Sequence, residues 1–158
     1  MKSQEFMQLL DSLCACSKAK EWAQGKSFHV VWTTCKRGDW LLWLCGKMAD
    51  KKGWPTRKQL VLAACSCAET ALKYVKEGED RPRIAIETAR KWARGKATLQ
   101  QVTAAAAAAD AAYAAYAAAA AAAAYDAAAA YAAAAAARSK MLAACAEIVR
   151  ANYPESPL

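Results

Sequence analysis

The longest part of the chain without a glycine or proline is residues 98–150, which read TLQQVTAAAAAADAAYAAYAAAAAAAAYDAAAAYAAAAAARSKMLAACAEIVR. Twenty-eight alanines fall between residues 104 and 137, and alanine has the highest helix propensity of all amino acids. A continuous helix over this stretch would be about 80 Å long. A compact domain of 158 residues is only about 40 Å across. We therefore expect the helix to break near Ala124–Asp126, with Asp126 capping its second half.

The alanine tract offers little side-chain surface and lets helix backbones approach closely. Its only bulky side chains are four tyrosines, namely Tyr113, Tyr116, Tyr125 and Tyr131. One interpretation is a central helix pair surrounded by bulkier helices, and another is an interface between copies of the chain. An ice-binding surface is disfavoured because the tract has no regularly spaced threonine. The few charges on the tract favour a homo-oligomer.

Start and stop signals outside the tract predict further helices over 4–13, 18–24, 28–34, 40–49, 57–76 and 82–94. The expected caps are Ser3, Ser27, Asp39 and Asp80, with capping boxes at Thr56/Gln59 and Thr98/Gln101. Residues 28–34 contain strand-favouring valines and threonines, but no partner strand is evident, so we expect a helix. The predicted fold is all-α, a single-domain bundle of about six to eight helices over residues 1–158. Within it, 1–103 is basic, 104–137 is the Ala/Tyr tract and 138–158 is a terminal helix and tail.

The chain is basic, with 22 Lys and Arg against 14 Asp and Glu and a net charge of +8. Residues 1–103 hold 19 of the basic and 10 of the acidic residues, so the positive charge lies outside the alanine tract. No stretch resembles a membrane span or a secretory signal. We therefore expect a cytoplasmic protein without a membrane partner.

Seven cysteines without a secretory signal indicate reduced thiols. The Cys14/Cys16 and Cys65/Cys67 pairs have a single-residue spacer, whereas zinc sites favour two to four residues between ligands. We expect no metal site, and buried thiols instead. His29 is the only imidazole, and no phosphate-binding glycine loop is present. These features disfavour an enzyme and predict no cofactor.

Residues 35–44 read CKRGDWLLWL and form the first candidate site. The glycine permits a tight turn, and Asp39 can cap the helix that follows. Trp40 and Trp43 are three residues apart and share a helix face. This cluster is either a helix start with two core tryptophans or an anion site that uses Arg37 and the free amides.

The second candidate site is residues 81–94, where Arg83, Glu87, Arg90 and Arg94 form one helical stripe. Glu87 is placed to orient the guanidinium groups of its neighbours. The stripe is either a solvated face or an anion-binding surface.

Three stretches, residues 35–43, 57–68 and 81–98, resemble the putative immunity protein family, an all-helical group of bacterial and phage genomes. The similarity covers about residues 20–150. Members often have proline before the Arg-Gly-Asp-Trp run, where this chain has Lys36. The family name implies neutralisation of a toxin.

Charge and tryptophan content lead to three functional hypotheses. The first is a non-enzymatic binder of phage–bacteria conflict that sequesters an anionic nucleotide-like defence signal. In this hypothesis both clusters form one basic pocket, with Trp40, Trp43 and Trp92 as flat surfaces. The second is an immunity protein that blocks a toxin or defence protein by direct contact. The third, nucleic-acid binding, is disfavoured because Glu87 interrupts the basic stripe.

Overall fold

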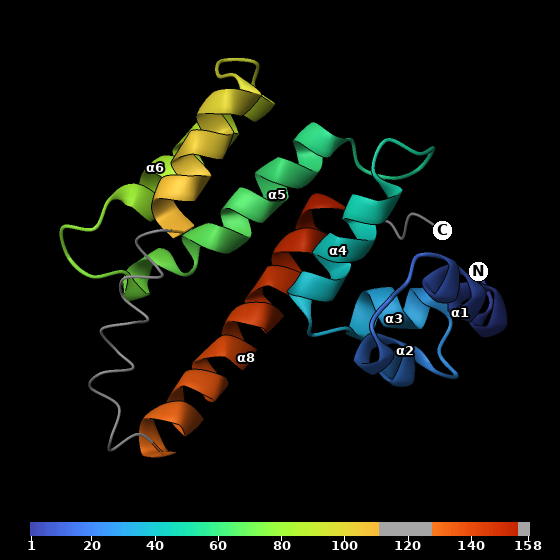
Figure 1. Ribbon diagram of the computed structural model, residues 1–158. Coiled ribbons are helices and arrows are strands. Elements are labelled where there is room, and N and C mark those ends of the chain that lie inside the picture. The colour runs from blue at the N-terminus through green and yellow to red at the C-terminus, as the bar shows by residue number, and fades with distance from the viewer. Residues whose placement is uncertain (111–127, 155–158) are drawn as a thin grey trace. The chain divides into compact units, whose positions relative to one another are not determined.

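The computed structural model describes residues 1–110 and 128–154, with side chains of the last helix from residue 136 onward. These residues form helices and no strand, which confirms the predicted all-α class. Residues 99–110 are helical, and the helices with defined bounds are α1 (Ser3–Ser12), α2 (Ser17–Ala23), α3 (Phe28–Thr34), α4 (Gly38–Met48), α5 (Arg57–Glu69), the 3-10 helix η1 (Leu72–Tyr74), α6 (Arg81–Ala93) and α8 (Ala128–Asn152) (Figure 1).

One prediction about the alanine tract, the helix break near Ala124–Asp126, falls outside this description. The side chains of the four tract tyrosines also lie outside it. Among the described helices, none has both the length and the apolar character that crossing a membrane requires.

The chain divides into two compact units. Unit 1 comprises Met1–Leu60 and Leu142–Leu158, and it contains α1 to α4 with the C-terminal part of α8. Unit 2 comprises Val61–Met141, which includes most of α5, η1 and α6. The expected single helical domain over 1–158 stays a prediction.

Several helix starts follow the sequence signals directly. Ser27 caps α3 by accepting a hydrogen bond from the amide of Val30 at 3.3 Å, so residues 28–34 form the predicted helix. The capping box before α5 is also present, because the Thr56 amide donates to Oε1 of Gln59 at 2.8 Å. The same bond between Thr98 and Gln101 is 2.8 Å long and precedes the helical residues 99–110.

Other caps differ from the expectation. Ser3 is the first residue of α1 and not its cap. The N-cap is Lys2, whose backbone amide donates a hydrogen bond to the Glu5 carboxylate at 2.9 Å. Asp39 lies inside α4, whose N-cap is Arg37, because the helix already begins at Gly38. Asp80 occupies the predicted cap position of α6, but its side chain makes no capping hydrogen bond to the helix backbone.

The helix predicted over 57–76 ends early, at Glu69. Both the amide and the hydroxyl of Thr70 donate to the carbonyl oxygen of Cys67, at 3.2 and 2.7 Å. A threonine side chain that competes for a helix carbonyl favours a turn over a further helical residue. The short η1 helix follows this turn.

Aromatic side chains from three parts of unit 1 form its core. The ring of Phe28 lies 5.3 Å from Phe6, 5.8 Å from Trp32 and 6.0 Å from Trp54, measured between centroids. All four side chains are buried, and such aromatic pairs each add about 0.5–1.5 kcal/mol beyond simple burial. The first helices are thereby fixed against α3, which positions the candidate site.

Among the residues of unit 2 whose side chains the structure describes, 61–110 and 136–141, the buried ones are small, namely Ala63, Cys65, Cys67 and Ala93. The Cys65 thiol contacts the carbonyl oxygen of Ile86 at 3.6 Å, so α5 and α6 approach closely. Small side chains at this contact permit the close approach of the two helices.

Candidate functional site

The start of α4 carries an arginine that is held from two sides. Nε of Arg37 donates to Oδ1 of Asp39 at 2.8 Å, and Nη2 donates to Oδ2 at 2.6 Å. The guanidinium carbon lies 4.3 Å from the ring centroid of Trp40. The Arg37 hydrogen bonds lower the pKa of Asp39, whose carboxylate in turn raises the pKa of Arg37. Predicted residues Arg37, Asp39 and Trp40 are thus in direct contact.

Two contacts with α8 position this turn. Gly38 is buried, and a Cβ atom there would lie 2.4 Å from Cβ of Cys145. Glycine is needed for this close approach and not for the tight turn that we expected. Nη1 of Arg150 donates to the carbonyl oxygens of Trp32 at 3.0 Å and Cys35 at 2.9 Å. Arg150 therefore satisfies carbonyls at the end of α3, which would otherwise lack partners.

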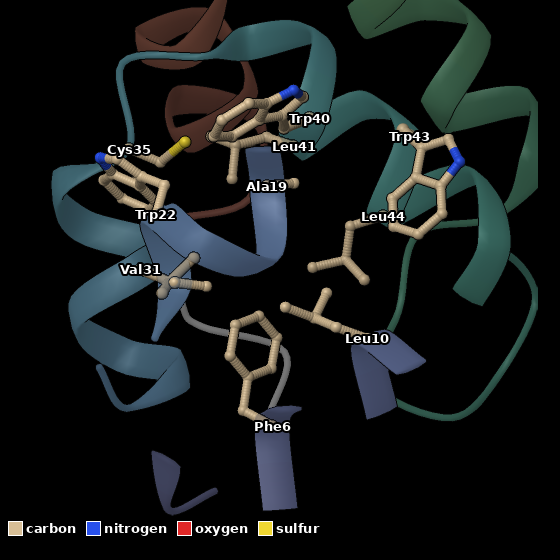
Figure 2. A pocket seen from close by; sticks show the side chains of 11 residues that line it. Phe6, Leu10, Ala19, Trp22, Val31, Cys35, Trp40, Leu41, Trp43 and Leu44 are labelled. Atoms are coloured by element: carbon tan, nitrogen blue, oxygen red, sulfur yellow. The ribbon is translucent and has the colours of Figure 1, made fainter. Parts of the chain in front are cut away.

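Beside Trp40, apolar side chains from α1 to α4 surround a small cavity, called here the tryptophan recess (Figure 2). It is lined by Phe6, Leu10, Ala19, Trp22, Ala23, Val31, Cys35, Trp40, Leu41, Trp43 and Leu44. Trp22, Trp40 and Trp43 are partly exposed, whereas most of the other lining residues are buried, so the tryptophans form its mouth. The recess has a volume of about 30 Å³.

Each tryptophan at the mouth carries a cation near its ring. The pairs are Lys26 with Trp22 at 4.5 Å, Arg37 with Trp40 at 4.3 Å and Lys47 with Trp43 at 5.9 Å. The rings of Trp22 and Trp40 lie 6.1 Å apart, and Figure 2 shows both indoles at one side of the recess with Trp43 at the other. The mouth is therefore both aromatic and positively charged.

Sequence reasoning missed Trp22, Lys26 and Lys47 as members of this site. Trp22 precedes Lys26 by four residues, and Trp43 precedes Lys47 by four. Residues four apart are neighbours on a helix surface, so this spacing was the available signal. The contribution of α1 had no such signal because it depends on tertiary packing.

The stripe on α6 differs from the expectation in its partners. Nη2 of Arg90 donates to Oε2 of Glu69 on α5 at 2.7 Å and to Oγ of Ser66 at 3.3 Å. Nε of Arg83 lies 3.7 Å from Oδ1 of Asp80, and both side chains are exposed. Arg90 is therefore tied to the neighbouring helix, and the Glu69 carboxylate raises its pKa.

Glu87 does not hold these guanidinium groups, contrary to the expectation. Its side chain is exposed and makes no hydrogen bond or ion pair within residues 1–110 and 128–154. Arg94 is exposed, and Trp92 is partly exposed. The predicted joint pocket combines residues of unit 1 with residues of unit 2, and it stays a prediction.

The cysteines divide by exposure. Cys35, Cys45, Cys65 and Cys67 are buried, and burial raises the pKa of Cys45 to about 12. Cys14 and Cys16 are exposed, so the expectation of burial was wrong for this pair. The described residues contain no cluster of three or more histidine, cysteine or acidic side chains that could hold a metal ion.

A family model described as Imm-5 like putative immunity protein matches residues 54–152. Since this match covers more than half of the chain, the chain belongs to that family, which confirms the resemblance inferred from the sequence. The tryptophan recess lies before the matched residues. Comparisons with curated proteins and with solved structures find no match.

Proposed function

We propose that this protein is a non-enzymatic immunity protein that neutralises a toxin or defence protein by direct contact in the cytoplasm. Membership of the immunity protein family supports a protein partner. The observation that carries the choice is the size of the tryptophan recess. Its volume of about 30 Å³ holds a group of only a few atoms, because a single buried water already needs about 10–15 Å³ measured in the same way.

The pairing of the arginines supports the same proposal. Arg37, Arg90 and Arg150 already donate to carboxylates of the chain itself. A phosphorylated ligand would have to displace these partners, and breaking an existing charged hydrogen bond offsets much of the gain from a new one.

Sequestration of an anionic nucleotide-like molecule remains the second candidate. It is favoured by the charge of residues 1–103, which hold 19 basic and 10 acidic residues. At the end of α6, the side chains of Lys91 and of the C-cap residue Arg94 are exposed and make no ion pair within the described parts of the chain. The homo-oligomer expected from the alanine tract is compatible with either candidate function. Light scattering at tens of micromolar protein tests whether the chain self-associates.

The test is a growth-protection assay. The tagged protein is purified from cells that produce it naturally, and any protein retained in a fixed ratio is expressed alone in a second host. We expect this partner to arrest growth and co-expression of the present chain to restore it. Growth arrest that persists when the chain is co-expressed at equal level would contradict the proposal.

A further inference from the structure

The tryptophan recess is built to accept something apolar and small. A cavity needs roughly 10–15 Å³ to hold a single buried water, so a recess of about 30 Å³ holds about two groups as large as a water or a methyl. All eleven lining side chains are apolar apart from the indole nitrogens and one thiol. An aromatic ring is too large for this volume, whereas the end of an aliphatic side chain fits.

The charges at the mouth indicate which groups of a partner would surround the aliphatic side chain. Lys26, Arg37 and Lys47 lie over the three mouth tryptophans, and of these three cations only Arg37 pairs with a carboxylate of the described residues, that of Asp39. Nη1 of Arg37 donates no hydrogen bond to any described residue, and Lys47 is exposed without an ion pair in that same part of the chain. Both groups can therefore contact acidic groups of a partner.

We infer that the tryptophan recess is the docking point for one aliphatic side chain of the partner protein, flanked on that partner by carboxylates. The inference rests on the proposed function, in which the partner is a protein. Hot spots of protein interfaces have this construction, with an apolar anchor in a desolvated pocket and polar groups around it. Opposite charges at the rim also accelerate association and exclude basic partners.

The mouth tryptophans provide a direct readout of binding. In the ¹⁵N-labelled full chain, each indole N–H gives its own resonance, and Trp92 of unit 2 serves as an internal control. The probe is the synthetic peptide Asp-Glu-Leu-Glu-Asp. We expect it to shift the resonances of Trp22, Trp40 and Trp43 and to leave that of Trp92 unchanged.

Two further peptides separate the two parts of the inference. Asp-Glu-Ser-Glu-Asp removes the aliphatic anchor, and Lys-Lys-Leu-Lys-Lys reverses the charge. Loss of one buried aliphatic side chain should weaken binding about 10- to 100-fold, and the basic peptide should not bind. Equal shifts with all three peptides, or no shift at the highest soluble concentration, would overturn the inference.

Variants of the recess complete the test. Ala19→Leu fills the recess, and its matched control Ala144→Leu adds the same atoms to an exposed position on α8. Lys47→Glu reverses one mouth charge, with Lys58→Glu as the control at an exposed lysine elsewhere in unit 1. We expect both recess variants to lose peptide binding at least 10-fold and both controls to retain it. If Ala19→Leu does not fold, Lys47→Glu still decides the charge requirement.

The growth-protection assay distinguishes failure of the docking inference from failure of the proposed function. If the recess variants fold and lose both peptide binding and protection, the recess is the docking point. If they protect as well as the unaltered chain, the inference fails while the proposed function stands. If the unaltered chain protects against no protein partner, the proposed function itself fails.

Discussion

Replacement of Gly38 by alanine tests how α4 is placed against α8. The added Cβ would lie 2.4 Å from Cβ of Cys145 and 2.7 Å from the backbone nitrogen of Ala146. These neighbours are a Cβ and a backbone atom, and neither can move away by rotation of a side chain. Overpacking of this kind costs about 1–3 kcal/mol, and the better helix propensity of alanine returns up to about 1 kcal/mol. The 2.4 Å contact places the cost at the upper end of this range, so we expect a net loss of about 2 kcal/mol for Gly38→Ala.

Gly46→Ala is the matched control in the same helix. Gly46 is exposed, and its added Cβ would meet only Cδ2 of Leu60 at 3.6 Å, an ordinary van der Waals contact. Here the propensity gain is unopposed, so the free energy of unfolding should rise by about 0.5–1 kcal/mol.

The assay is thermal unfolding followed by circular dichroism at 222 nm. One kcal/mol corresponds to about 2–4 °C for a chain of this size, so Gly38→Ala should melt about 4–8 °C lower and Gly46→Ala about 1–4 °C higher. Equal melting of Gly38→Ala and the unaltered chain would refute the close approach between α4 and α8.

Three more predictions concern single side chains. Arg150→Met should lower the free energy of unfolding, measured in urea, by about 2–3 kcal/mol, because two carbonyls at the end of α3 lose a charged donor. The control is Arg57→Met, which removes an exposed ion pair with Asp50 and should lower the free energy of unfolding by less than about 0.5 kcal/mol. Cys14 should react with Ellman's reagent in the native protein, and Cys45, whose thiol pKa is raised to about 12, only on unfolding; denatured protein without reductant should titrate close to seven thiols, and slow labelling of Cys14 would be inconsistent with its exposure. Arg37 lowers the folded-state pKa of Asp39 below the ordinary value of about 3.9, so its stabilisation is present above pH 4 and is lost as the pH falls through the folded pKa. Asp39→Asn should therefore be less stable than the unaltered chain at pH 7, by less than about 1 kcal/mol, and this difference should shrink as the pH falls below 4; a constant difference would exclude this linkage.

Local signals predicted much of the fold. The Ser27 cap and the Thr56/Gln59 and Thr98/Gln101 boxes are satisfied within three residues of sequence, so the chain alone determines them. Residues 28–34 form a helix despite their β-branched side chains, because the cap and the burial of Phe28 in the core outweigh that weak preference.

The parts that sequence could not predict depend on contacts between distant segments. The pairing of Arg90 with Glu69 joins residues 21 positions apart on different helices, whereas helical spacing alone favoured Glu87 as its partner. The role of Gly38 likewise depends on α8, more than 100 residues away in the sequence. The tryptophan recess forms where side chains of α1 to α4 meet, and composition carries no signal for that.

The most direct test of the proposed function is native mass spectrometry of the protein isolated from cells that produce it. The account predicts a complex whose added mass is that of a folded protein, released intact when the complex is denatured. Release of a phosphorylated small molecule in fixed ratio to the chain, with no protein partner, would contradict the account and establish sequestration instead.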